Sequence, residues 1–309
     1  MPRSRSAALP RSALPAVCRA RASPRAAALA LRQRFGSRFR PIVAKRGLRF
    51  GSYRMGTNVD GQASPLALKS KKRKQADRKG ISRANGIASC LFKYWRQRYS
   101  LFSRYDAGIK MDNEGWFSVT PEAIASSHAA HAASSSAAVV IDCFAGVGGN
   151  AIQFAAWGFL VIAVEIDPRK VYYAVNNARV YGVKDRIEFV VGDFFSLAPF
   201  LKGDVVFLSP PWGGPSYSRI QTFTLDMLKP KDGYLIFQAA QKISPNIIMF
   251  LPRNVDLRQV EELSWLSCPP LALKIEENYM ETSLKGITAY FGDIALVPSK
   301  SSLSKTDIS

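Results

Sequence analysis

A tryptophan on a rigid turn is the first feature of this sequence that suggests chemistry. The run FLSPPWGGPSY (207–217) begins as a hydrophobic strand and stops at two prolines, which cannot donate hydrogen bonds to a sheet ladder. Trp212 follows directly, and the two glycines after it permit tight backbone turns. Trp212 is therefore predicted at the carboxyl end of a strand, where open α/β sheets bind ligands. The alternative is a core tryptophan beside a turn.

The residues around this tryptophan offer two hydrogen-bond acceptors and one flat face. The Ser209 hydroxyl and the carbonyl at Pro210 can accept hydrogen bonds from an amine, while Trp212 can stack on the ring that carries it. A ring-conjugated amine is a poor nucleophile, so catalysis would be mostly alignment, and the nitrogen would lose its proton after attacking. Trp212 also attracts a cationic ring through its π quadrupole. Ser-Pro-Pro-Trp resembles the motif of methyltransferases that modify exocyclic amino groups.

A glycine-rich loop joins the first predicted strand to the first predicted helix. It lies within VVIDCFAGVGGNAIQFA (139–155), after Asp142. Gly146 and Gly148 let the backbone approach a ligand closely, and the free amides at the helix start can cradle its polar groups. The loop alone is weak support for any one cofactor, because many dinucleotide-binding proteins have such a loop.

Three acidic residues close successive predicted strands: Asp142, then Glu165, then Asp193. Glu165 is placed to accept hydrogen bonds from ribose hydroxyls, and Asp193 suits an adenine amino group. This ordered set suits an adenosine that carries a cationic amino acid better than a pyrophosphate. We therefore expect S-adenosylmethionine rather than a nicotinamide dinucleotide as the cofactor. For any single acid, the alternative is a helix cap or a surface charge.

Strands and helices alternate along the chain from residue 138, which predicts right-handed crossovers and a parallel α/β sheet. The expected strands lie at 138–144, 159–166, 186–193, 204–209 and 247–252, with helices from 149 and 168. Two strand-like runs at 271–280 and 286–297 have no convincing helix between them, which predicts an antiparallel hairpin at one edge. This order resembles the Rossmann-like class I S-adenosylmethionine-dependent methyltransferase fold, which implies a mostly parallel seven-stranded sheet.

A small helical extension (91–137) is predicted in front of the methyltransferase domain (138–299). Its aromatic residues recur every three or four positions from residue 92 to 105, which predicts one aromatic helix face. Residues 111–124 predict a turn, an extended piece and a helix start, with Thr120 as N-cap and Pro121 as first helical residue. The Ala/Ser tract at 126–138 predicts an ill-specified linker or the end of a surface helix.

The positive charge of the chain is concentrated in its first 90 residues. The net charge is +20, and residues 1–90 alone hold 22 Lys and Arg against two Asp, which predicts a disordered basic tail. Residues 1–59 hold no acid and resemble an organelle transit peptide. The cluster KSKKRKQADRK (69–79) indicates nuclear import or an RNA-binding arm, with a solvated charge run as the alternative. We expect a nuclear protein, and the nucleolus or the Cajal body is a possible location within the nucleus. The alternative is organelle targeting by residues 1–59. Residues 300–309 are predicted to form a second disordered tail.

Several classes of protein are disfavoured by composition. No stretch approaches the roughly 18 uncharged apolar residues of a membrane helix, so no membrane contact is expected. The four cysteines form no close pair, which disfavours a disulfide framework or a zinc ribbon. Both histidines lie in one Ala/Ser tract, so neither a metal site nor a histidine-based triad is expected.

Longer segments of the chain resemble the trimethylguanosine synthase family. The resemblance covers roughly residues 91–296 and rests on KYWRQRYSLFSRYDAGIKMDNEGWFSVTPE, DCFAGVGGNAIQFA, LSPPWGGPSY, FLPRN and ITAYFGD. It implies two successive methyl transfers from S-adenosylmethionine to the guanine 2-amino group of a 7-methylguanosine RNA cap. The expected partners are capped small nuclear and nucleolar RNAs and their protein complexes, and the protein is expected to be a monomer.

The resemblance also implies roles for individual residues. Trp212 would stack on the cap, with Ser209 and Pro210 positioning the amine. The acids that close the three strands would contact the cofactor. The segment that contains Trp116, Phe117 and Thr120 would fold over it. Asn177 and Arg253 would lie near the cap base and its phosphates. A helix-surface amide at Asn177, and an ion pair between Arg253 and Asp256, are the structural alternatives.

Two other functions stay open at this point. One is methylation of an exocyclic amine on guanine or adenine elsewhere in RNA or DNA, since it needs the same motifs. The other is a catalytically silent RNA-binding protein with the same fold. The intact set of Asp142, Glu165, Asp193 and Ser209 argues against the silent protein, because such a protein has no need of it.

Overall fold

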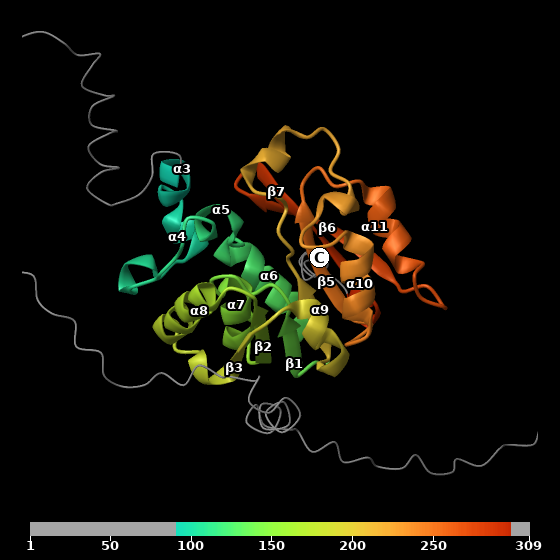
Figure 1. Cartoon of the computed structure of the whole chain (residues 1–309), viewed down its shortest axis with the longest axis horizontal. Coiled ribbons are helices and arrows are strands. Elements are labelled where there is room, and N and C mark those ends of the chain that lie inside the picture. Colours follow the sequence, from blue (N-terminus) through green and yellow to red (C-terminus); the bar gives the residue numbers. More distant parts are fainter. Residues whose placement is uncertain (1–90, 298–309) are drawn as a thin grey trace, which may run out of the picture.

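One sheet of seven strands runs through the computed structural model, which describes residues 91–297 (Figure 1). The strand order across the sheet is β3-β2-β1-β4-β5-β7-β6. The strands are β1 (Val139–Asp142), β2 (Leu160–Glu165), β3 (Ile187–Val191), β4 (Val205–Leu208), β5 (Ile247–Pro252), β6 (Leu273–Met280) and β7 (Ser283–Phe291). The predicted tails at 1–90 and 300–309, with their targeting signals, lie outside the described residues.

Helices cover both faces of this sheet (Figure 1). One face carries α6 (Glu122–Ala133), α7 (Gly149–Ala156) and α8 (Pro168–Val180); the other carries α9 (Phe194–Leu197), α10 (Gly233–Gln241) and α11 (Leu257–Ser264). Consecutive residues of one strand enter opposite cores, as Val205 packs on the α7 side and Val206 on the α10 side. Burial on both faces explains why the parallel strands are continuous apolar runs.

The predicted sheet is confirmed, including its C-terminal hairpin. β1 to β5 are parallel, and β7 is antiparallel to both of its neighbours, with Ile247 opposite Phe291. The strand expected over 286–297 ends earlier, at Phe291. Gly292 turns the backbone there with φ +83°, and a 3₁₀ helix (Asp293–Leu296) follows.

The start of the extension differs from its prediction. Two short helices, α3 (Phe92–Trp95) and α4 (Arg98–Leu101), replace the single helix with one aromatic face. The chain becomes extended at Phe102, which is buried, whereas Tyr99 is 47% exposed. The Arg98 guanidinium lies 4.1 Å from the Trp95 ring centroid and 4.2 Å from that of Tyr99. Cation–π contact therefore occupies aromatic faces that a core would otherwise cover.

The helix predicted to begin at Pro121 begins one residue later, at Glu122. Pro121 is the N-cap of α6, without a side-chain hydrogen bond, so the prediction of Thr120 as N-cap was wrong. A short helix, α5 (Gly115–Ser118), takes the place of the predicted extended piece. Asp112 Oδ1 accepts a hydrogen bond from the Gly115 amide at 2.8 Å, which stabilises that turn of helix.

The Ala/Ser tract forms a core helix, so its prediction as a linker or surface helix end was wrong. α6 runs through most of the tract, and its alanines allow close packing: Ala125, Ala129 and Ala132 are fully buried. His128 and His131 are buried too. The Nε2 atom of His128 is hydrogen-bonded to Thr288 on β7, and that of His131 to the Ile294 carbonyl in the 3₁₀ helix after β7. The serines and histidines of the tract favoured a surface prediction, whereas the two histidines find their hydrogen-bond partners inside the protein.

A buried asparagine on α8 joins the extension to the glycine loop. Asn177 is fully buried; its Oδ1 accepts from the Lys110 amide at 2.8 Å. Its Nδ2 donates to the Lys110 carbonyl at 2.9 Å and to the Val147 carbonyl at 3.0 Å. One side chain therefore satisfies three backbone groups from two segments.

Replacing Asn177 with leucine, which has nearly the same shape, should destabilise the fold by about 2–4 kcal/mol, because three buried backbone groups lose their partner. Urea denaturation would measure the loss. Asn176→Ala is the matched control: its amide donates to the Gly108 carbonyl at the surface and to Asn177 Oδ1 at 3.3 Å. Its loss leaves the three buried backbone groups with their partner, and we expect a loss below about 1 kcal/mol. Equal losses for the two variants would contradict the role given to Asn177.

Candidate active site

A cleft of about 720 Å³ opens at the carboxyl ends of the parallel strands. Its walls are the extension, the glycine loop and the loop after β4. Most residues singled out from the sequence line it: Trp116, Phe117, Thr120, Asp142, Gly146, Glu165, Asp193, Ser209, Pro210, Trp212 and Arg253. Parallel strands end at one edge of a sheet, which is why Asp142 and Arg253, 111 positions apart, both line the cleft.

Two residues predicted for the site lie behind its wall. Gly148 has φ +91°, and a Cβ there would lie 3.1 Å from the Ala174 Cβ, so glycine is needed for the turn and for helix packing. Asn177 is buried, with its amide used by the backbone, so it is neither a cleft residue nor the surface amide of the alternative. The structure therefore does not bring Asn177 into the cleft with the other predicted site residues.

Asp142 is the most unusual group in the cleft. It is 1% exposed, and neither carboxylate oxygen has a hydrogen-bond partner within the described part of the chain. Burial raises the pKa of Asp142 to about 7, and the Phe144 backbone amide opposes the shift in part. An unpartnered buried carboxylate is costly, so a cationic or hydrogen-bond-donating ligand here would be strongly favoured.

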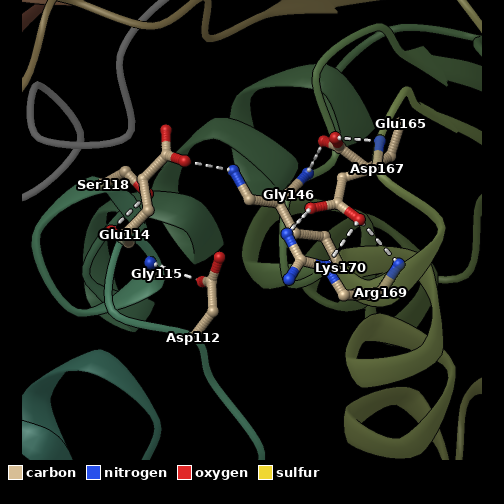
Figure 2. Close-up of polar contacts among 9 residues, drawn as sticks. All are labelled: Asp112, Glu114, Gly115, Ser118, Gly146, Glu165, Asp167, Arg169 and Lys170. Carbon is tan, nitrogen blue, oxygen red and sulfur yellow. Dashed lines mark hydrogen bonds and ion pairs between the residues drawn. The ribbon is translucent and has the colours of Figure 1, made fainter.

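Glu165 fixes the shape of the glycine loop (Figure 2). Its Oε2 accepts from the Gly146 amide at 2.8 Å, and its Oε1 accepts from the Asp167 amide at 2.9 Å. Asp167 in turn caps α8 by accepting from the Arg169 amide. Each Glu165 oxygen keeps a second lone pair, so the side chain can still accept a hydrogen bond from a ligand.

An ion pair holds the extension at the cleft (Figure 2). Lys170 Nζ on α8 lies 2.6 Å from Glu114 Oε2, directly before α5, and both residues line the cleft. α5 carries Trp116 and Phe117, so this contact sets the wall that they form. No sequence signal pointed to the pair, because its partners lie 56 positions apart and Lys170 belongs to no quoted motif.

Asp193 combines two of the readings considered for it. Its Oδ2 accepts from the Ser196 amide and hydroxyl, so it is the N-cap of α9, and it also lines the cleft. The cap uses one oxygen and leaves the other for a ligand.

Trp212 is clamped rather than buried. It is half-buried, with Tyr217 edge-on at 5.1 Å between ring centroids and Phe250 at 5.3 Å. Gly213 and Gly214 follow with φ near +80°, a region that favours glycine, and they turn the chain away. The indole Nε1 is buried without a partner in the described chain. The clamp fixes the ring while part of it still faces the cleft.

Apart from Lys170, which pairs with Glu114, the cleft-lining cations come from other elements than the three acids. Asp142, Glu165 and Asp193 follow β1, β2 and β3, on one side of the sheet. The cations on the opposite side or on the extension are Lys93, Lys229, Arg253 and Lys285. Arg253 makes no ion pair within residues 91–297, since Asp256 caps α11 instead.

Sequence reasoning missed Tyr217, Lys229 and Lys285 in this part of the site. Tyr217 lies inside the quoted Ser-Pro-Pro-Trp segment and could have been found there. Lys285 reaches the cleft only because β7 lies beside β5, a neighbour relation that no local pattern encodes.

Residues 91–297 hold neither a metal-binding cluster nor a membrane-spanning helix. No group of three or more His, Cys, Asp or Glu side chains there is arranged to hold a metal ion. Within the same range, no helix has the length and apolar character needed to cross a bilayer.

Comparison with known proteins gives concordant matches. Residues 137–294 match the family model described as RNA cap guanine-N2 methyltransferase. The chain is 40% identical over 212 residues to trimethylguanosine synthase of Schizosaccharomyces pombe, covering 66% of this chain and 87% of that protein. It is 42% identical over 217 residues to the Saccharomyces cerevisiae trimethylguanosine synthase, covering 66% and 68%.

A solved structure supports the fold alone. A protein of Porphyromonas gingivalis W83 classed as a methyltransferase superposes with a TM-score of 0.51 at 14% identity. The superposition covers 65% of this chain and 48% of that one.

Asp142→Asn should change how stability depends on pH. The pKa of Asp142 is raised from 3.8 to about 7 in the folded protein, so the folded state holds this proton more tightly than the unfolded state. Stability from this group is therefore lost as pH rises from about 4 to 7. We expect the stability advantage of the asparagine variant to grow by about 2 kcal/mol between pH 5 and pH 8. Parallel pH profiles in urea unfolding would show that Asp142 ionises normally.

Proposed function

Because this chain belongs to the RNA cap guanine-N2 methyltransferase family, we propose that it adds two methyl groups in succession to the 2-amino group of a 7-methylguanosine cap. The family makes it an S-adenosylmethionine-dependent methyltransferase that acts on RNA caps. The two-step course, and small nuclear and nucleolar RNAs as substrates, are the parts that we propose. The observation that carries the proposal is a clamped tryptophan directly after a Ser-Pro-Pro turn, in the same cleft as an unpartnered buried carboxylate.

The acidic half of the cleft fits the cofactor. S-adenosylmethionine supplies an electrophilic methyl group. The unpartnered Asp142 suits the cationic amino group of the methionine part, since the pair would neutralise the buried charge. Glu165 and Asp193 each keep acceptor capacity, suited to ribose hydroxyls and to the adenine amine. At Gly146 a Cβ would meet no atom within 4 Å, so space for a ligand adjoins the loop.

The other half fits a methylated cap. A 7-methylguanine ring is cationic, and Trp212 would attract it and hold its plane in a fixed orientation in the cleft. Ser209 Oγ and the Pro210 carbonyl would accept hydrogen bonds from the 2-amino group and aim its lone pair. Arg253, with the neighbouring lysines, would balance the charge of the triphosphate.

These groups do the work by alignment. The amine nitrogen needs no strong base before it attacks, since its proton becomes acidic only as the new C–N bond forms. Trp116 and Phe117, held by the Lys170–Glu114 pair, would keep water from the reacting atoms. A second round would use one of the two acceptors, because a singly methylated amine still has one proton to donate.

A methyl-transfer assay separates this reaction from its alternatives. We expect the full-length protein, given labelled S-adenosylmethionine, to add two methyl groups to a 7-methylguanosine-capped dinucleotide and none to the same dinucleotide with an unmethylated cap. Mass spectrometry would resolve the products. Equal transfer to both caps would contradict the role of the cationic ring, and transfer to neither, with the cofactor bound, would indicate an internal base as substrate.

Trp212→Ala should lower the rate of cap methylation at least about 100-fold, because the amine loses its alignment. Affinity for S-adenosylhomocysteine should stay within about threefold, since Asp142 and the glycine loop are untouched. Trp265→Ala is the control: Trp265 is 67% exposed after α11 and does not line the cleft. A Trp212 variant with near-normal turnover would sink the stacking role.

A further inference from the structure

His128 is a fully buried polar residue directly beneath the cleft. It lies on α6, has no exposed surface, and is outside the set of cleft-lining residues. Its Nε2 is 2.8 Å from Thr288 Oγ1 on β7, and its Nδ1 is 3.1 Å from Asn150 Nδ2 on α7. The mechanism above makes no use of this residue.

The hydrogen-bond partners define which ring nitrogen carries the proton. Asn150 Nδ2 can only donate, so Nδ1 of His128 is the acceptor and Nε2 carries hydrogen. Nε2 then donates to Thr288 Oγ1, which also accepts from Asn278 Nδ2 at 2.7 Å. Burial lowers the pKa of His128 to about 3, which keeps the ring neutral and Nδ1 free to accept.

Asn150 connects this network to the cleft. It is the residue after Gly149, it lines the cleft, and its Nδ2 is engaged by His128. Its Oδ1 is the amide atom that remains for a ligand, because it has no hydrogen-bond partner within residues 91–297 and is not a fully enclosed atom.

The same ring also contacts β4 and β5, the strands that lead to the Ser-Pro-Pro-Trp turn and to Arg253. The His128 ring centroid lies 5.4 Å from that of Phe207 on β4 and 5.3 Å from that of Phe250 on β5. Phe250 is one of the two rings that clamp Trp212. Rotation of His128 would therefore displace rings packed beneath the Trp212 side of the cleft.

We propose that His128 is a positioning residue that orients the Asn150 amide, so that its oxygen is presented to the cofactor half of the cleft as a hydrogen-bond acceptor. The inference rests on the proposed function, because the group that would donate belongs to S-adenosylmethionine or its product. It adds Asn150 to the residues that would hold the cofactor and makes the hairpin of β6 and β7 the support for that contact.

The test compares the affinity of full-length variants for S-adenosylhomocysteine by calorimetry. His128→Phe keeps a ring and removes both hydrogen bonds, and we expect about 5- to 10-fold weaker binding. His128→Asn restores an acceptor near the Nδ1 position and should return affinity to within about threefold of wild type. His131→Phe is the matched control on the same helix: His131 bonds the Ile294 carbonyl, stacks on Tyr290 and does not line the cleft.

A purely structural role would lower the melting temperature of both phenylalanine variants alike and leave both affinities unchanged, which would overturn the proposal. If His128→Phe does not fold, His128→Gln replaces it: it keeps the Nε2-like donor without the acceptor, and binding as tight as that of His128→Asn would overturn the proposal.

A second readout is the tautomer of His128 in ¹⁵N NMR. We expect the neutral form with hydrogen on Nε2, and hydrogen on Nδ1 would contradict the orientation of Asn150. Wild-type protein that binds no S-adenosylhomocysteine would overturn the proposed cofactor together with this inference, whereas unchanged affinity in His128→Phe would overturn the inference alone.

Discussion

The carboxylate of Glu165 is the contact on which the rest of the site depends. It accepts hydrogen bonds from the glycine loop and from the residue that caps α8, so one side chain sets both the floor of the cleft and the helix beside it. α8 then holds the extension, through Lys170 to Glu114 and through Asn177 to Lys110. A displacement of Glu165 would therefore move the glycine loop directly and the extension through α8.

The parts of the structure that sequence could predict are those with local patterns. The parallel strands are buried on both faces and read as apolar runs, and the acids that close them belong at one edge by topology. The Ser-Pro-Pro-Trp turn could be assigned because prolines and glycines restrict the backbone directly. These local rules predict most of the residues that line the cleft.

The parts that sequence could not predict depend on distant partners. Arg98 covers aromatic faces that a periodicity argument assigns to a core, and Asn177 satisfies backbone groups from a segment 67 positions away. The core helix in the Ala/Ser tract, predicted as a linker or a surface helix end, could not be found because burial of His128 and His131 needs partners on β7 and in the 3₁₀ helix after it. Tertiary contacts override local preference wherever a polar group finds its partner far along the chain.

The packing of α6 has a consequence for how the protein comes apart. α6 belongs to the extension by sequence, yet its alanines share one core with α7 and with strands from both halves of the sheet. Loss of α6 would expose the part of that face that α7 and α8 do not cover. Because the extension and the domain behind it share this core, we expect the cleft wall and the sheet to denature together.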